Sequence, residues 1–180
     1  IKQHQIRYWD ELPKQYSAVI SIDPAYSEEE KADYKVASLV CADVNGSRYL
    51  QTYIRTHAPT GEFMDSIINL YLANKDRVVA LGVPSSGTEK MFYSSFLKRC
   101  SDRRVSPPIV ELKNVAYTSD GRSVRNKKNR IITTLQPLFE QGKYYIHKDH
   151  VEAKDELLSI GFSRHDDLVD TLAYAEQIIQ

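Results

Sequence analysis

The sequence predicts an α/β domain with a mixed central sheet of five strands, in which three antiparallel strands come first and parallel strands follow. The chain opens with three runs rich in β-branched and aromatic residues, and Asn45-Gly46, typical of a two-residue hairpin turn, separates the last two. Farther along, stretches with apolar residues at helical spacing alternate with short apolar runs. This alternation is typical of parallel strands joined by crossover helices.

The expected elements follow one another in a regular order. The opening antiparallel strands are expected at 17–23, 35–42 and 48–55. Later strands are expected at 77–83 and 108–113, with a short strand at 144–147. Helices are expected at 60–74, 88–99, 126–141, 152–158 and 166–179.

Length and composition predict one domain with a core of its own. The chain has 180 residues, 42% of them hydrophobic, and no apolar run approaches the length of a membrane span. Residues 17–180 are expected to form the domain and residues 1–16 a linker from a missing upstream part, because Ile1 is preceded by neither an initiator Met nor a signal peptide. Cys41 and Cys100 lack CxxC spacing, so we expect reduced thiols of a cytosolic protein and no zinc site.

Acidic residues and a histidine crowd the start of the last expected helix. Asp166 and Asp170 are i, i+4 neighbours, Asp167 and Asp170 are i, i+3 neighbours, and His165 precedes them. Like charges at these spacings repel, so Mg²⁺ or Mn²⁺, which prefer carboxylate oxygens, would stabilise the cluster. The alternative is an ordinary helix start, which favours Asp at Asp166 and Asp167 but explains Asp170 less readily.

A further acid stands at the end of the first expected strand. The apolar run from Ser17 to Ile22 ends at Asp23, which proline follows. In open α/β sheets, ligands usually bind at the carboxyl ends of the strands, so this carboxylate is well placed for chemistry. The alternative is an ordinary Asp-Pro turn.

A basic segment lies on a chain whose net charge is zero. A flexible basic segment suits the phosphate backbone of DNA, which it would bind without regard to base sequence. A solvated charge run at a helix start is the alternative interpretation. The positive residues of this segment are Arg122, Arg125, Lys127, Lys128 and Arg130.

The order of the elements and three short stretches together resemble the nuclease domain of the large terminase subunit of tailed phages, a member of the ribonuclease H-like superfamily. The resemblance covers about residues 17–180 and implies the ribonuclease H-like fold. It also implies an ATPase motor domain upstream of this chain. The three stretches are Ile22-Asp23-Pro24-Ala25 followed by Asp33-Tyr34, Gly82-Val83-x-Ser85 before a helix, and His165-Asp166-Asp167-x-x-Asp170-x-Leu172-Ala173-Tyr174-Ala175, the most specific of them.

The resemblance implies a metal-dependent endonuclease that cleaves double-stranded viral DNA concatemers during genome packaging. Asp23 and the acids of the last helix would hold two Mg²⁺ or Mn²⁺ ions about 3.5–4 Å apart for phosphodiester hydrolysis. Asp167 is the first choice of ligand there and Asp166 the second, while Asp170 is a second-site ligand or orients its neighbours. His165 either positions water or the scissile phosphate, or only caps or packs.

The same resemblance implies partners and a location. The partners are double-stranded DNA, the upstream ATPase domain of the same polypeptide, the portal protein and the small terminase subunit. The location is the cytoplasm of the bacterial host, and no contact with a membrane is expected.

One position departs from the family pattern. Members of the family commonly carry an acid just after the fourth strand, in a pattern of the form Gly-Val-Glu, and here the corresponding residue is Pro84. Glu89, in the next helix, and Asp33 are the candidates to supply the missing carboxylate. Otherwise the metal site is weaker than usual, or the sequence has been changed to disarm it.

Three functions from different classes agree with these features. The first is the terminase-type endonuclease, and the second is another ribonuclease H-like nuclease of the resolvase or transposase type, which would use the same acids. The third is a catalytically weakened module that only docks to DNA or to a portal, a reading that Pro84 permits.

Overall fold

The computed structural model describes residues 1–25, 33–118, 120–124, 126–163 and 165–179. Within these ranges the main sheet has seven strands in the order β1-β9-β4-β3-β2-β5-β6. A separate two-stranded sheet pairs β7 with β8. The strands are β1 (Arg7–Tyr8), β2 (Ser17–Asp23), β3 (Lys35–Ala42), β4 (Arg48–Thr56), β5 (Val78–Pro84), β6 (Ile109–Leu112), β7 (Ala116–Tyr117), β8 (Ser123–Val124) and β9 (Tyr144–Ile146).

The predicted mixed sheet is confirmed. The strands β2, β3 and β4 form the antiparallel meander, and the turn between the last two contains Gly46 at φ +81°. The strand β5 then adds in parallel beside β2, and β6 adds in parallel beside β5. The sheet has seven strands rather than the expected five, because the short β9 pairs in parallel with β4 and the two-residue β1 pairs in parallel with β9.

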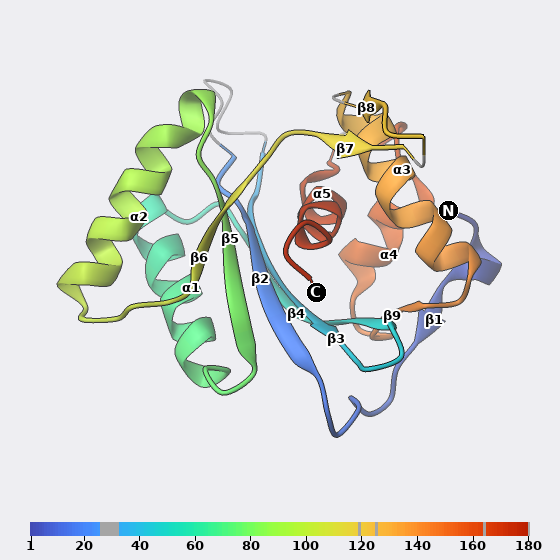
Figure 1. Cartoon of the computed structure of the whole chain (residues 1–180), viewed down its shortest axis with the longest axis horizontal. Coiled ribbons are helices and arrows are strands. Elements are labelled where there is room, and N and C mark those ends of the chain that lie inside the picture. The colour runs from blue at the N-terminus through green and yellow to red at the C-terminus, as the bar shows by residue number, and fades with distance from the viewer. Residues whose placement is uncertain (26–32, 119, 125, 164, 180) are drawn as a thin grey trace.

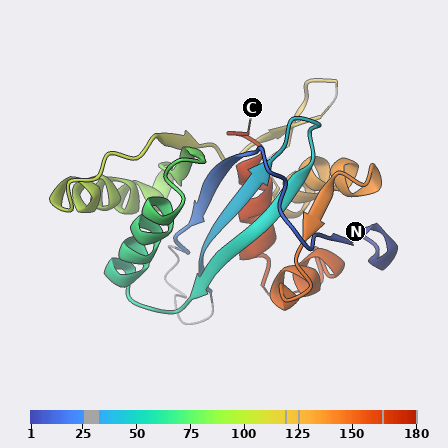
Figure 2. The ribbon, with the colours of Figure 1, turned by 90° about the horizontal axis from the view of Figure 1, so that it is seen from below.

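Five helices cover the two faces of the sheet. Figure 1 shows α1 and α2 packed on one face and α3, α4 and α5 on the other, and the view from below in Figure 2 shows the same three layers. None of these helices combines the length and apolar character that a membrane span requires, within the ranges described above. The helices are α1 (Thr60–Ala73), α2 (Lys90–Asp102), α3 (Lys127–Glu140), α4 (Val151–Leu158) and α5 (Asp167–Ala175).

The last helix is shorter than the sequence predicts and more deeply buried. It ends at Ala175 rather than at Ile179, and the chain continues in tight turns in which the amide of Ile178 bonds the carbonyl of Ala175. Every residue from Asp167 to Ala175 is buried, because the sheet covers one side of the helix and α3 and α4 pack against it elsewhere.

Each face of the sheet has its own hydrophobic core. Along β2, Ala18, Ile20 and Ile22 pack with α1 and α2, whereas Val19 packs in the core that contains α5. Because side chains alternate between the faces of a strand, Asp23 at the end of β2 lies on the same face as Val19. The strand therefore directs this carboxylate toward the layer that contains α5.

Part of the segment that was expected to be a linker packs on the domain. Ile6 is buried in the core on the α5 side, and β1 extends the sheet beyond β9. The indole N–H of Trp9 donates to the carbonyl of Leu50 at 2.9 Å, and its ring packs on His147. Residues 6–9 therefore belong to the folded unit, while a connection to an upstream domain stays a prediction.

Candidate metal centre

Asp23 ends β2 at the carboxyl edge of the sheet. The chain turns immediately after it, and the backbone N–H of Ala25, at φ +52°, donates to Asp23 Oδ1 at 3.0 Å. Burial raises the pKa of Asp23 well above its ordinary value, and the nearby carboxylates of Asp167 and Asp170 raise it further. The Lys127 ammonium acts in the opposite direction. A cation close to such a carboxyl group favours its ionised form and is therefore bound there.

The first turn of α5 supplies the opposing carboxylates. Asp167 and Asp170 are both buried, and Asp166 immediately precedes the helix. No side-chain cap made by Asp166 is found at this helix start, so capping does not explain the acids. Asp166 is the N-cap residue of α5 without making a capping hydrogen bond, while Asp167 and Asp170 lie in the first turn, where the helix dipole favours acids.

The capping role belongs to Glu156, a residue that the sequence did not single out. Glu156 comes from α4, and its Oε1 accepts the backbone N–H groups of Leu168 and Val169 at 3.0 and 3.1 Å. Burial raises the pKa of Glu156 to about 7, and the charge of Asp167 adds to the shift. No local signal predicts this contact, because it depends on how α4 docks against α5.

Two cations from α3 hold the acids of α5 together. Lys127 Nζ lies 2.8 Å from Asp166, 3.1 Å from Asp167 and 3.7 Å from Asp170. Arg130 Nη2 donates to both carboxylate oxygens of Asp170, at 2.9 and 3.0 Å. Burial alone would lower the pKa of Lys127, but the surrounding carboxylates raise it above its ordinary value. The cluster is thus organised by positive charge, and Asp170 has the contacts of an orienting residue.

The donor atoms fit a divalent ion. Asp33, His165 and Asp167 each offer one ligand atom, and these atoms lie within 4.8 Å of one another. The Nδ1 atom of His165 is buried, and no hydrogen-bond partner is found for it in the part of the chain that the structure describes. Carboxylate oxygens suit Mg²⁺ and Mn²⁺, whereas an imidazole nitrogen is a ligand for softer divalent ions such as Zn²⁺.

Pro84 lies where the sequence placed it, beside Asp23. In the parallel pair of β2 and β5, Ser21 pairs with Gly82, so continuing this register brings Pro84 level with Asp23. Glu89 reaches the same cavity from the 3-10 turn Gly87–Glu89, and its buried Oε2 finds no hydrogen-bond partner within the described ranges. Burial, followed by the charge of Asp170, raises the pKa of Glu89. Glu89 therefore has the features of a substitute for the missing acid.

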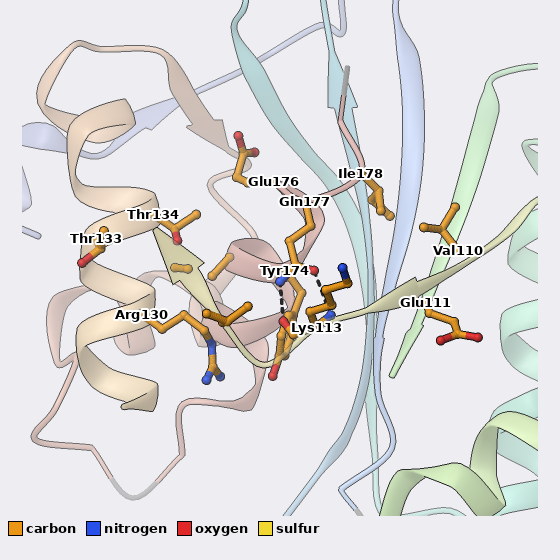
Figure 3. Close-up of a pocket in the computed structure, with 13 residues that line it drawn as sticks. Val110, Glu111, Lys113, Arg130, Thr133, Thr134, Tyr174, Glu176, Gln177 and Ile178 are labelled. Atoms are coloured by element: carbon orange, nitrogen blue, oxygen red, sulfur yellow. Dashed lines mark hydrogen bonds between the residues drawn. The ribbon is translucent and has the colours of Figure 1, made fainter. Parts of the chain in front are cut away.

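Two neighbouring cavities share a wall made by Arg130 and Tyr174. The polar cavity, of about 340 Å³, contains Asp23, Asp33, Glu89, Asp167 and Asp170. A larger and mainly apolar cavity, of about 590 Å³, lies between α3, β6 and the end of α5, and Figure 3 shows its lining. The acids gather along the smaller cavity, so the chemistry of the lining rather than the volume marks that cavity as the candidate metal centre.

The basic segment divides between the metal centre and the surface. Lys127 faces the acids, and Arg130 is buried against Asp170, so the structure does not support the predicted DNA contact of Arg130. Lys128 and Arg122 are exposed, as a DNA contact requires, although Arg122 also pairs with Asp120 at 2.9 Å. Arg125 lies outside the described residues.

No protein-family model matches the sequence, and a comparison with curated proteins finds no match. Solved structures do match it in fold. The large terminase of a thermophilic bacteriophage matches 99% of this chain with a TM-score of 0.67 and 13% identity, and this chain spans 44% of its length. This likeness agrees with the predicted α/β fold built on a mixed central sheet.

Two isolated nuclease domains match over nearly their whole length. The human cytomegalovirus terminase nuclease domain, soaked with Mn and bound to an inhibitor, has a TM-score of 0.64 and 12% identity, with coverage of 100% of this chain and 95% of that one. The large terminase nuclease of the thermophilic phage G20c has a TM-score of 0.58 and 17% identity, with coverage of 97% and 93%. A further structure of that phage nuclease contains magnesium. At these identities the likeness is one of fold.

Proposed function

We propose that this chain, which has the fold of large-terminase nuclease domains, is a metal-dependent endonuclease that cuts double-stranded viral DNA during genome packaging. The observation that carries the proposal is the meeting of Asp23 with Asp33, His165 and Asp167 in and around one polar cavity, at the carboxyl end of β2. The Mn-soaked and Mg-bound structures of proteins with this fold support the choice of metal.

Each residue of the site has a role in this proposal. Asp23 at the end of β2 and Asp167 on α5 would hold Mg²⁺ or Mn²⁺, with Asp33, Asp166 and Glu89 as further oxygen donors. When bound, two such ions supply the charge that activates a water and stabilises the leaving 3′ oxygen.

The remaining side chains position these groups. Arg130 orients Asp170, which lines the same cavity, and Glu156 fixes the first turn of α5 through two backbone amides. His165 binds metal or positions the scissile phosphate beside Asp167. Exposed Lys128 and Arg122 contact the phosphate backbone, whose charge they match without reading base sequence.

The proposal extends to the whole packaging machine. In it, residues 1–16 connect this domain to an upstream ATPase motor, and the portal protein and the small terminase subunit are the other partners. The fold match to a large terminase of which this chain spans 44% supports the upstream domain. The host cytoplasm, where such a machine works on DNA, is the proposed location.

Cleavage of supercoiled plasmid tests the function. The unaltered protein should nick and linearise plasmid with Mn²⁺ or Mg²⁺ and should be inactive with chelator. Asp23→Asn and Asp167→Asn should each lower the rate by at least about a hundredfold, since each removes a charged metal ligand. The control Asp155→Asn changes an exposed carboxylate on α4 and should retain the full rate.

Two outcomes would contradict the proposal. Full cleavage by Asp23→Asn or Asp167→Asn would remove the acids from the mechanism. A folded, unaltered protein that binds DNA but does not cut it with either metal would instead favour the docking module.

A further inference from the structure

Phe162 is an apolar side chain exposed to solvent, and it precedes His165 of the candidate metal centre by three residues in the chain. It is 89% exposed, the highest fraction among the large hydrophobic residues in the described ranges. Single exposed apolar residues are ordinary on protein surfaces, so exposure alone does not indicate function. Two features distinguish this ring from other exposed side chains: its position in the chain and the contacts that fix its loop.

The backbone fixes the loop that carries the ring. The N–H groups of Phe162 and Ser163 both donate to the carbonyl of Ser159, at 2.9 and 3.0 Å. Gly161 adopts φ +86°, and a Cβ on it would lie 2.4 Å from Cε of Lys128. The Lys128 side chain therefore packs over the loop at a glycine, and the positive φ of that glycine disfavours a larger residue there.

Lys128 and Phe162 form one composite surface. The Lys128 ammonium lies 5.4 Å from the centre of the phenyl ring, in cation–π geometry. An aromatic ring beside a mobile cation offers a contact for a base and a contact for a phosphate at the same place. This pair of chemistries matches a nucleic acid better than it matches an apolar protein surface.

The chain limits how far the backbone of Phe162 lies from the candidate metal centre. Phe162 precedes His165 by three residues, so the two backbones are at most roughly 10 Å apart. Successive nucleotides of a strand rise by about 3.4 Å along duplex DNA, so this span covers about three base pairs.

We propose that Phe162 wedges between base pairs within about three steps of the scissile phosphate, while Lys128 binds the adjoining backbone. An apolar wedge of this kind partly unstacks the step and kinks the duplex. Pyrimidine–purine steps such as TA and CA/TG unstack most easily, so the wedge places cuts near them although no base edge is read. This inference rests on the proposed nuclease function and adds a determinant of where it cuts.

Sequencing the ends of DNA cut by the domain with Mn²⁺ tests the cut positions. The unaltered protein should enrich TA and CA/TG steps near the cut, and Phe162→Ala should reduce the enrichment by roughly twofold or more. Phe162→Trp should retain the enrichment, because an indole can also wedge. Val44→Ser, which changes a residue 84% exposed at the β3–β4 turn, is the matched control and should leave the pattern unchanged.

A second measurement does not depend on cleavage. DNA with 2-aminopurine at a TA step should brighten when the protein binds in Ca²⁺, and Phe162→Ala should abolish the increase. Lys128→Ala should weaken binding of all sequences alike and keep the cut pattern.

The outcomes separate the two proposals. Identical cut positions and identical fluorescence for the unaltered protein and Phe162→Ala would overturn the wedge and leave the ring as a protein contact. Failure of all variants to cut, with a Phe162-dependent fluorescence change intact, would overturn the nuclease function but not the wedge.

Discussion

At the scale of single residues, the candidate metal centre is a set of carboxyl groups, and burial makes several of them difficult to ionise. Burial is the largest cause of the raised pKa values of Asp23, Asp170 and Glu89, and the charge of at least one neighbouring acid adds to each of them. Without a divalent ion, the cluster depends on Lys127 and Arg130 for its positive charge. A bound ion would replace repulsion with coordination, so metal affinity and stability should change together.

Glu89 should contribute to metal affinity in place of the acid missing at Pro84. Glu89→Gln should weaken Mn²⁺ binding on the order of tenfold, because one anionic oxygen near the site is lost. Pro84→Glu should restore the affinity in that background, since residue 84 lies level with Asp23. Titration calorimetry measures both effects, with exposed Glu62→Gln as control. Unchanged affinity in Glu89→Gln would exclude Glu89 from the site.

Glu156 should make the metal-free protein less stable as pH rises. Its carboxyl loses a proton near pH 4.5 in the unfolded chain and near pH 7 in the folded domain. The folded state therefore binds the extra proton between these values, and the stabilisation present below pH 4.5 is lost as pH rises to about 7. A shift of this size corresponds to about 3 kcal/mol.

Glu156→Gln tests this dependence because glutamine keeps the acceptor for the two α5 amides. The variant should be about 1–3 kcal/mol more stable than the unaltered protein at pH 8 and nearly equal to it at pH 5. Urea unfolding with chelator at both pH values provides the measurement. Glu140→Gln, at an exposed position of α3, is the control. If Glu156→Gln changed the free energy of unfolding by the same amount at pH 5 and pH 8, the raised pKa of Glu156 would be contradicted.

At the scale of elements, strand alternation and helix rotation decide which charges meet. Because side chains alternate between the two faces along β2, the side chain of Asp23 lies on the face that α5 covers. The sequence alone predicts both this strand and the acid at its end. On α3, Lys127 faces the acids whereas the next residue, Lys128, faces solvent. A run of basic residues cannot show this division, because it depends on which face of α3 packs against α5. The burial of Arg130 against Asp170 depends on the same packing, and its contact with DNA stays a prediction.

The two lysines should therefore behave differently. Lys127→Met should destabilise the metal-free protein by about 1–3 kcal/mol, since it leaves the acids with less compensation, and should tighten Mn²⁺ binding because a competing cation is removed. Lys128→Met should change neither quantity and should reduce the salt slope of DNA binding by about one unit. Thermal unfolding, calorimetry and binding at several salt concentrations distinguish them. If the two variants changed stability, Mn²⁺ affinity and the salt slope alike, the assignment of Lys127 to the acids and of Lys128 to the DNA-binding surface would be refuted.

Element boundaries show where sequence patterns lose information. The meander, the parallel return and all five helices could be predicted, because their periodicity extends over several residues. The two-residue strands β1, β7 and β8 could not, because two residues carry no period and pair only when the partner strand is in place. Glu156 was missed among the site residues because its function depends on the docking of α4 on α5.

At the scale of the whole molecule, three layers place the acids at one edge of the sheet. Asp23 comes from the central layer, and the remaining acids and cations come from α5, α3 and the loops around them. Residues far apart in sequence are thus held by a common core, which preorganises the site before any ion binds. Solved terminase nuclease domains share this architecture at 12–17% identity, so the fold is retained where most of the sequence is not.

Metal binding should stabilise the whole domain. An ion that binds only the folded state at a concentration of 100 times its Kd adds about 2.7 kcal/mol. For a chain of this size, that corresponds to a rise in Tm of about 5–10 °C. A thermal scan with Mn²⁺ should show this rise, and the double variant Asp23→Asn with Asp167→Asn should not. The same rise in both proteins would place the binding site elsewhere.

Anomalous diffraction from crystals soaked in Mn²⁺ tests the central claim most directly, because it locates the ions without relying on activity. Ions at this site should give anomalous peaks within about 2.0–2.6 Å of carboxylate oxygens of Asp23 and Asp167, the range of hard-cation coordination. Lys127 should have moved away from Asp167 in the same crystals. The absence of peaks at these two residues, with the Lys127 ammonium still bonded to Asp167 at saturating Mn²⁺, would contradict the account.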